Sequence, residues 1–342
     1  MSSKLANHAN LRLFYDKWLI NMYLLLNQTI KNQSDLVDLA RNGIPKNAVI
    51  KMAKQLSFRG KELSIIINLS ERTLQILFFL IIISFNQAFA QNADETIFSQ
   101  KMKLTNAETK AQTALVIAKS FLGKPYKAGT LEGNNDEQLI CNLRDFDCST
   151  FVESVTAMTL TKYSDKPTYK NYLQELRKLR YRNGEIDGYA SRLHYFREWI
   201  IQTEEKNIAK DITNLVGGEK LVKEINFMST HRELYPNLKD ENAFATVKKN
   251  QKVLNQYYFY FIPKTKVSKI ENQIKDGDII AITSTVAGLD FNHEGFAIHR
   301  NGRLHLLHAS YEQKKVIISD EPLSDYLARI KKHSGISVLR LL

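Results

Sequence analysis

Residues 292–310, with the sequence NHEGFAIHRNGRLHLLHAS, indicate the fold of the C-terminal part of this chain. Asn301-Gly302 lies between two apolar runs, and this dipeptide is typical of the two-residue turn of a β-hairpin. With these two residues as the turn, Arg300 pairs with Arg303, and every other pair of the hairpin follows from that one. A β-bulge would shift this register.

The predicted register assigns the histidines of this segment to two faces. His293 and His308 share one face as diagonal neighbours, near enough for their side chains to meet. Gly295 lies opposite His308 and leaves room for it. His299 is expected on the same face but near the turn, and His305 on the apolar face. The spacing therefore selects His293 and His308 as a pair.

The spacing of apolar residues along the rest of residues 91–342 predicts an α+β fold. Helical spacing precedes strand-like spacing along the chain, an order that favours helices packed on an antiparallel sheet. No linker or repeat interrupts residues 91–342, so we expect one domain there. The predicted helices are Asn106–Phe121, Asp147–Leu160 and Tyr169–Leu179, and the predicted strands are Gln256–Ile262, Asp278–Ser284, Glu294–His299, Leu304–His308 and Ile336–Leu341.

The second informative stretch, residues 145–154 (DFDCSTFVES), contains one of the two cysteines. Asp147 is a favourable N-cap residue, and the apolar stripe that follows it predicts a helix. Cys148 then lies in the first helical turn, where the helix dipole is expected to lower the pKa of its thiol. A nucleophile is the favoured interpretation, and a disulfide with Cys141 is the alternative.

A nucleophilic cysteine needs a base and a third group that orients the base, and the histidine pair could supply both. The sequence has no Cys-x-x-Cys motif, no histidine pair that accompanies the cysteines at zinc-finger spacing and no His-Glu-His set of zinc ligands. We therefore expect neither a metal nor an organic cofactor. A separate cluster, Arg192, His194, Tyr195 and Trp199, is interpreted at least as well as a packing and hydrogen-bonding unit as it is as a sugar- or carboxylate-binding site.

Several motifs, in order along residues 110–342, resemble the N-acetylmuramoyl-L-alanine amidase-like family of the NlpC-type, papain-like cysteine peptidases. They include GKPYKAGTLEG (123–133), DFDCSTFVES, GLDFNHEGFAIH (288–299) and LHLLHAS (304–310). The resemblance implies an α+β papain-like NlpC-type domain. It also implies an amide hydrolase that cuts muropeptides, or peptidoglycan fragments, between N-acetylmuramic acid and L-alanine.

The resemblance further implies a role for five residues. Cys148 matches the nucleophile, His293 the base and His308 the residue that orients the base. Tyr126 matches a tyrosine near the oxyanion site, and Asp147 an acidic neighbour of the nucleophile that contacts the substrate. A peptide-stem endopeptidase and a non-catalytic muropeptide-binding protein are the alternatives. No obligate protein partner is indicated.

Residues 1–75 are expected to be a small helical extension with helix-turn-helix dimensions. The segment Arg41–Gln75 resembles the Xre/MbcA/ParS-type antitoxins, which implies DNA binding; a helical bundle without DNA contact is the alternative. Residues 1–90 carry 11 basic and 5 acidic residues, half of the net charge of +12. The remainder is mildly basic, which suits an anionic polymer without requiring nucleic acid.

Residues 76–90 combine a ten-residue run, Ile76–Phe85, that is apolar except for Ser84, with an Ala-Phe-Ala ending. A membrane span needs about 20 apolar residues, whereas this length and ending are typical of a secretory signal peptide. Export to the periplasm or cell envelope is therefore expected if this segment is used as a signal, and a cytoplasmic location if it is not. Its position, well inside the chain, favours a gene fusion or a later start such as Met52.

Overall fold

The computed structural model describes residues 93–132 and 136–342, of which Asp94–Leu342 forms one compact unit. The predictions made for residues 1–75 and 76–90 lie outside the described residues. Within the described part, none of the helices has the length and apolar character needed to cross a membrane.

Helices and short 3-10 turns make up most of the first half of this unit, beginning with a helical stretch at 93–102. The α-helices are α6 (Lys110–Lys119), α7 (Cys148–Lys162), α8 (Tyr169–Arg180), α9 (Phe196–Glu205), α10 (Phe227–Thr230), α11 (Glu241–Leu254) and α12 (Leu323–Arg329). The 3-10 helices are η1 (Arg182–Gly184), η2 (Tyr189–Ser191), η3 (Arg232–Leu234), η4 (Pro236–Lys239), η5 (Val267–Lys269) and η6 (Glu271–Gln273).

Antiparallel pairing joins all the strands that the structure describes into one sheet. Its order is β2-β3-β8-β4-β5-β6-β7, and β1 pairs with β8. The strands are β1 (Ala209–Asp211), β2 (Glu219–Leu221), β3 (Phe259–Pro263), β4 (Ile279–Ser284), β5 (Phe291–Arg300), β6 (Arg303–Ser310), β7 (Lys315–Ile318) and β8 (His333–Leu341). The predicted α+β class with an antiparallel sheet is confirmed.

The hairpin β5–β6 has the predicted register. Arg300 pairs with Arg303 and Phe296 with Leu307, and both turn residues, Asn301 and Gly302, adopt the positive φ that a two-residue turn requires. A bulge does occur, but on the other side of β5: Ile282 pairs with His293 whereas Thr283 pairs with Phe291. The register with β6 is therefore intact, and the bulge places an irregular step immediately before His293.

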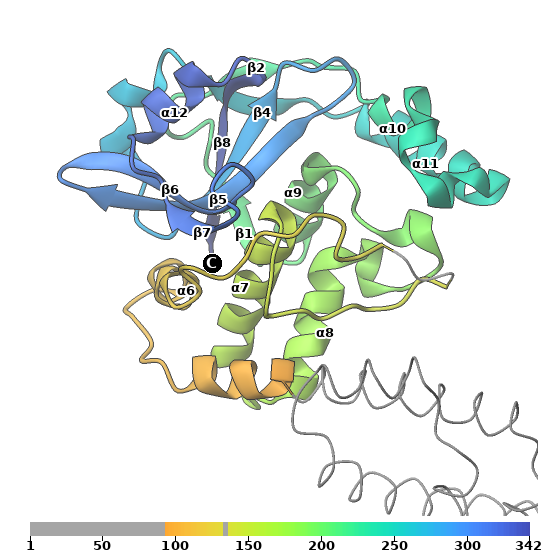
Figure 1. The fold of residues 1–342 in the computed structure, drawn as a ribbon. Helices are drawn as coiled ribbons and strands as arrows, with labels where there is room; N and C mark the ends of the chain where they lie inside the picture. Colours follow the sequence, from red (N-terminus) through yellow and green to blue (C-terminus); the bar gives the residue numbers. More distant parts are fainter. Residues whose placement is uncertain (1–92, 133–135) are drawn as a thin grey trace, which may run out of the picture. The chain divides into compact units, whose positions relative to one another are not determined.

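Both faces of the sheet are buried, each by different helices (Figure 1). One face packs on α6, α7 and α8, where Phe296 and Leu307 meet Phe151 and Val155. The opposite face packs on α12, where Ala297 and Leu306 belong to the same apolar cluster as Leu323 and Leu327. Because side chains alternate along a strand, neighbouring residues of β5 enter different layers.

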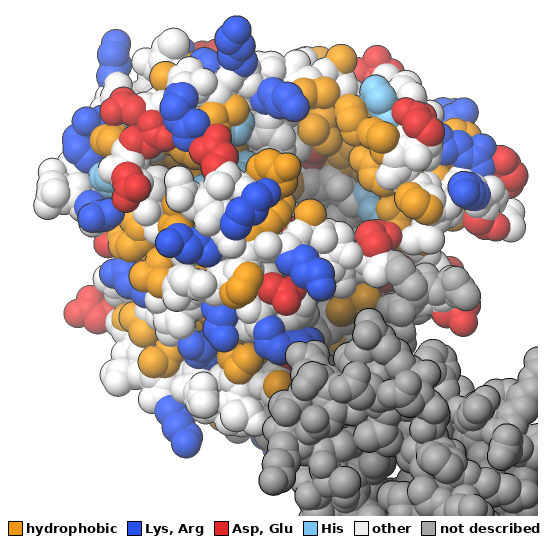
Figure 2. Space-filling model, viewed as in Figure 1, with side chains coloured by type: hydrophobic (Ala, Val, Ile, Leu, Met, Phe, Trp, Pro, Cys, Tyr) orange, Lys and Arg blue, Asp and Glu red, His pale blue; other side chains and the backbone are white. Residues whose placement is uncertain are grey.

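Positive side chains are interspersed with acidic ones over the face of the molecule shown in Figure 2. This mixture agrees with the mild net charge of the C-terminal part of the sequence. The fold is not a strict succession of helices and then strands, since β1 and β2 precede α11 and α12 lies between β7 and β8. These departures matter because α12 covers the histidine face of the hairpin.

Candidate active site

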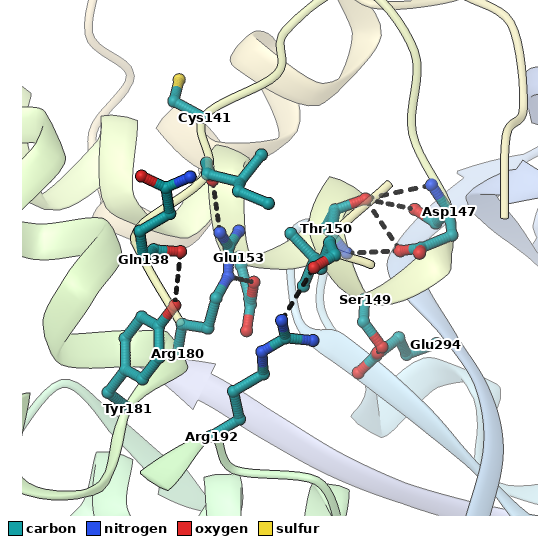
Figure 3. Close-up of polar contacts among 12 residues, drawn as sticks. Gln138, Cys141, Asp147, Ser149, Thr150, Glu153, Arg180, Tyr181, Arg192 and Glu294 are labelled. Atoms are coloured by element: carbon teal, nitrogen blue, oxygen red, sulfur yellow. Dashed lines mark hydrogen bonds and ion pairs between the residues drawn. The ribbon is translucent and has the colours of Figure 1, made fainter. Parts of the chain in front are cut away.

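The N-terminus of α7 is fixed by a reciprocal capping box, as the sequence predicts. The Thr150 backbone N–H donates to Asp147 Oδ1 at 2.8 Å, and the Asp147 N–H donates to Thr150 Oγ1 at 3.0 Å. These contacts satisfy backbone donors that a helix start leaves free. Figure 3 shows Asp147 and Thr150 facing one another in this arrangement. Cys148 is consequently the first residue of the helix, with its position fixed by its neighbours.

The expectation of a lowered thiol pKa is wrong. Burial, followed by the nearby carboxyl groups of Glu294 and Asp147, raises the pKa of Cys148 well above its ordinary value. The backbone N–H groups of Ser149 and Glu294 oppose this rise but do not overcome it. The resting thiol is therefore protonated at neutral pH, so a base must remove its proton before it can attack.

A contact between Ser149 and Glu294, which the sequence analysis missed, joins α7 to β5. The Ser149 hydroxyl donates to Glu294 Oε1, and Figure 3 shows the two side chains pointing toward one another. Burial raises the pKa of the Glu294 carboxyl to about 8, so this group is mostly neutral at pH 7. Its second oxygen is buried without a hydrogen-bond partner among the described residues. Sequence alone could not distinguish it from an ordinary exposed glutamate.

The predicted histidine pair forms on the opposite face of the hairpin. His293 Nε2 lies 2.5 Å from His308 Nδ1, and the two rings meet edge to face. Burial lowers the pKa of His293 well below its usual value and that of His308 to about 4. Both rings are thus neutral at pH 7. Because Nε2 of His293 is engaged, Nδ1 is the nitrogen left to accept a proton.

Two further residues complete the histidine face, and neither was predicted. The Tyr326 ring, on α12, lies 5.5 Å from the His308 ring and 5.4 Å from the ring of His333 on β8. Burial, then the charge of Glu312 and to a lesser extent that of Cys148, raises the pKa of the Tyr326 hydroxyl. No local pattern marks Tyr326 or His333, because only the tertiary fold brings α12 and β8 to this hairpin.

Tyr126 lies beside the start of α7, as the sequence predicts. Its backbone forms a bridge with Phe146, and its ring packs edge to face on Tyr311 at 5.6 Å. Burial, then the proximity of Cys148 and Asp147, raises the pKa of the Tyr126 hydroxyl to about 12. The hydroxyl therefore remains a hydrogen-bond donor at every physiological pH.

The predicted site residues thus fall into two linked groups. Cys148, Asp147 and Tyr126 gather at the start of α7, while His293 and His308 contact each other directly on the hairpin. The link is the backbone N–H of Glu294, the residue after His293, which acts on the Cys148 thiol. The arrangement can support attack by a thiol whose proton passes to a neighbouring imidazole.

Two further residues that the sequence analysis considered, Cys141 and His305, make contacts within the protein. The two cysteines are free, which rules out the disulfide alternative in this structure, and Cys141 lies near the Tyr172 hydroxyl at 3.8 Å. The His305 ring, buried on the apolar face, contacts the Ser319 carbonyl at 2.8 Å through Nδ1.

Arg192 and His194, two members of the Arg192 cluster, make contacts within the protein. Arg192 forms ion pairs with Glu132 and Glu137, and the buried His194 ring contacts the Tyr189 carbonyl at 2.9 Å. Among the described residues, no group of three or more histidine, cysteine or acidic side chains is placed to hold a metal ion.

Several solved structures resemble this chain. An N-acetylmuramoyl-L-alanine amidase from Bacteroides uniformis is 38% identical, with a TM-score of 0.65 over 68% of this chain and 99% of its own. A candidate xylanase from Bacteroides fragilis is 41% identical, with a TM-score of 0.63 over 65% and 98%. A Legionella pneumophila protein, 22% identical with a TM-score of 0.57 over 75% and 95%, shares the fold. No curated protein matches the chain.

Two family models match separate parts of the sequence. Residues 35–77 match the antitoxin Xre-like helix-turn-helix domain, which confirms the resemblance of the N-terminal segment. Residues 116–336, well over half of the chain, match the N-acetylmuramoyl-L-alanine amidase-like model. The second match covers α7, β5 and β6 and agrees with the Bacteroides uniformis structure, and the protein therefore belongs to the N-acetylmuramoyl-L-alanine amidase-like family.

Proposed function

We propose that this protein is a cysteine-dependent peptidoglycan amidase that cuts the bond between N-acetylmuramic acid and L-alanine in muropeptides. The observation that carries the proposal is the position of Cys148, at the start of α7 and against the β5 backbone beside His293, whose ring is held by His308. The family and the named activity of the Bacteroides uniformis structure support the choice of substrate. The proposal includes the papain-like, NlpC-type mechanism that the sequence resemblance implies.

The first half of the reaction forms a thioester. His293 Nδ1 takes the proton from the Cys148 thiol, and the sulfur attacks the lactyl carbonyl carbon of the muramic acid. The carbon–nitrogen bond then breaks, and the imidazolium of His293 returns its proton to the departing amine of L-alanine. Because the pKa of Cys148 is raised and that of His293 is lowered, this transfer is unfavourable at rest and needs the substrate to drive it.

The second half of the reaction releases the sugar. His293 removes a proton from a water molecule, the hydroxide attacks the thioester carbon, and the sulfur leaves and regains a proton from His293. The backbone N–H of Cys148, at the helix start, and the hydroxyl of Tyr126 are the proposed donors to the oxyanion in both halves. The raised pKa of Tyr126 keeps that donor protonated.

Mass spectrometry of defined muropeptides incubated with the protein tests this proposal. Release of a peptide that begins with L-alanine, together with the free muramoyl sugar, is the expected result. Cleavage within the peptide stem would indicate the endopeptidase alternative instead. Cleavage of the glycan itself would support a glycosidase such as the name of the Bacteroides fragilis structure suggests.

The carboxyl groups near Cys148 argue against a glycosidase. A retaining or inverting glycosidase needs two carboxyl groups available to the scissile bond. Asp147 is occupied by capping α7, and Glu294 accepts the hydrogen bond from Ser149. One oxygen of each carboxyl is therefore engaged within the protein, which disfavours the paired roles that a glycosidase requires.

We also propose that residues 76–90 direct export and that the active enzyme works in the cell envelope. N-terminal sequencing of the protein from its native host tests this: a chain beginning near Gln91 is expected. A cytosolic chain that retains Met1 would contradict export.

The match of residues 35–77 supports a second proposed activity, binding of duplex DNA by the N-terminal segment. Such binding would weaken steeply with added salt, because phosphate contacts release counterions. Titration of the full chain with duplex DNA at low and physiological salt measures it. An affinity that is absent at low salt, or independent of salt, would contradict this second activity.

A further inference from the structure

One nitrogen of the histidine pair has no hydrogen-bond partner in the described part of the chain. His308 Nδ1 faces His293, but Nε2 of the same ring is buried without a contact. For His293 to accept a proton on Nδ1, its own proton must lie on Nε2 and be donated to His308 Nδ1. His308 must then carry its proton on Nε2. This buried N–H would be left unsatisfied, which is energetically costly.

A small cavity is lined in part by His308. Its volume is about 110 Å³, and its lining includes His308, Ser310, Glu312, Tyr326 and Arg329. Since a water molecule occupies about 30 Å³, the cavity has room for roughly three waters. The lining is polar enough to hold them, with a carboxylate and a hydroxyl among the available partners. Water in the cavity could thus provide the hydrogen-bond acceptor that the buried Nε2–H of His308 lacks.

Glu312 is the anionic group of this cavity that acts on the histidines. Arg329 forms a bidentate contact with the Glu312 carboxylate: Nη1 donates to Oε1 at 3.1 Å and Nη2 donates to Oε2 at 2.9 Å. The Arg329 contact lowers the pKa of the Glu312 carboxyl, which is therefore charged at neutral pH. The Glu312 carboxylate interacts electrostatically with both His308 and His333.

We propose that Glu312 accepts the His308 Nε2–H hydrogen bond through water in this cavity and so acts as a positioning residue for the catalytic histidine pair. The inference rests on the proposed function, because it assumes that His293 is the base. Glu312 fixes the tautomer of His308, and His308 in turn leaves Nδ1 of His293 free. The proposed chain of contacts runs from Glu312 through water and His308 to His293, the base that the proposed function assigns to the Cys148 thiol.

The same carboxylate also favours the charged intermediate. When His293 takes the thiol proton, its ring becomes positively charged. The carboxylate of Glu312, which interacts with the neighbouring His308, stabilises this positive charge. The other titratable or charged groups around His308 are His293 on β5, His333 on β8, Tyr326 and Arg329 on α12, and Asp320 and Glu321, which line the same cavity. Of the cavity's acidic residues, Glu312 is the one whose charge acts on His308.

The test compares Glu312→Gln with the matched control Glu321→Gln. Glu321 also binds Arg329, at 2.9 Å, but does not act on the charge of His308. For Glu312→Gln we expect kcat to fall about tenfold, the scale typical of lost outer-shell partners, with KM nearly unchanged. Glu321→Gln should match the wild type, and Glu312→Asp, which keeps the anion, should recover part of the loss.

The second readout is the nitrogen NMR spectrum of the histidine rings in the full chain, which does not depend on turnover. The expected spectrum shows His308 protonated on Nε2 in the wild type and in Glu321→Gln, with the Nδ1–H form appearing in Glu312→Gln. A His308 ring protonated on Nδ1 in the wild type, or unchanged in Glu312→Gln, overturns the inference. If Cys148→Ala still hydrolyses muropeptides, the proposed function fails while the tautomer result stands by itself.

Discussion

The two faces of the β5–β6 hairpin carry different chemistry. On the face under α12, His293 and His308 form a neutral pair in an apolar layer with Tyr326. On the face under α7, Glu294 accepts a hydrogen bond from the Ser149 hydroxyl, and this contact connects α7 to β5. His293 and Glu294 are consecutive in sequence and point to opposite layers. One strand therefore positions the proposed base from one side and the helix of the proposed nucleophile from the other.

Loss of the nucleophile should have the largest effect. Cys148→Ala is expected to abolish muropeptide hydrolysis, because the sulfur forms the only covalent bond of the proposed mechanism. Circular dichroism and the thermal midpoint should change little, since one sulfur atom is removed. Cys141→Ser is the matched control and should retain full activity; an inactive Cys141 variant would show that the wrong cysteine has been assigned.

Removal of the base should come next. His293→Ala is expected to lower kcat by about 10²–10⁴-fold, the usual contribution of a general base. His308→Asn or His308→Gln, which keep a polar acceptor for His293, should be more active than His308→Ala. Steady-state rates on one muropeptide decide this. Equal activity of all three His308 variants would show that this residue does not orient the base.

A larger side chain at Gly295 tests how closely strands β5 and β6 approach each other. A Cβ added at Gly295 would lie 2.7 Å from the Leu307 carbonyl oxygen and 2.9 Å from His308 Cβ. Gly295→Ala should therefore destabilise the protein by about 1–3 kcal/mol, as overpacking does, and should lower activity by displacing His308. Urea unfolding measures the stability.

Gly302→Ala is the matched control for Gly295→Ala. It has a φ of +76° but no atom near its Cβ, so it should lose stability through backbone strain alone while kcat remains unchanged. A Gly295→Ala protein as stable and active as the wild type would contradict the close approach of the two strands.

The nucleophile face is predicted to respond to pH through Glu294. Its folded pKa of about 8 exceeds the ordinary value of 4.5, so the folded state holds this proton longer than the unfolded state. The resulting stability is present at low pH and is lost as pH rises from 4.5 to 8. Glu294→Gln removes this dependence, and its stability relative to the wild type should increase across that window.

Urea midpoints at pH 5, 6.5 and 8 measure the Glu294→Gln difference. A difference that stays constant over these three values would contradict the buried, neutral carboxyl. Alkylation of Cys148 above pH 8 should also be faster in this variant, because an anion beside the thiol is removed.

The smallest effects on chemistry are expected at the remaining histidines of the hairpin. His305→Ala should cost about 1 kcal/mol through the lost contact with Ser319, and His299→Ala should lose its ring contacts with Asp276 and the Glu271 carbonyl. In both variants kcat should stay within twofold or so of the wild type. Loss of activity at His305 with retention at His308 would mean that the assigned faces are reversed.

Local patterns predicted much of this arrangement. The Asn-Gly turn fixed the hairpin register, and Asp147 marked the start of α7, because both signals depend on residues adjacent in sequence. The pKa direction of Cys148 was predicted wrongly, since the helix dipole is a local effect whereas burial depends on the whole fold. Tyr326 and Glu294 were missed for the same reason: their roles arise from packing between distant segments.

Acid quenching during turnover, followed by intact and peptide mass analysis, tests the central claim most directly. The mechanism predicts a muramoyl group attached through a thioester to the peptide that contains Cys148, and a larger trapped fraction when hydrolysis is slowed at low pH. The adduct should be absent in Cys148→Ala. A protein that hydrolyses muropeptides without any adduct on Cys148, or that remains active as Cys148→Ala, would contradict the account.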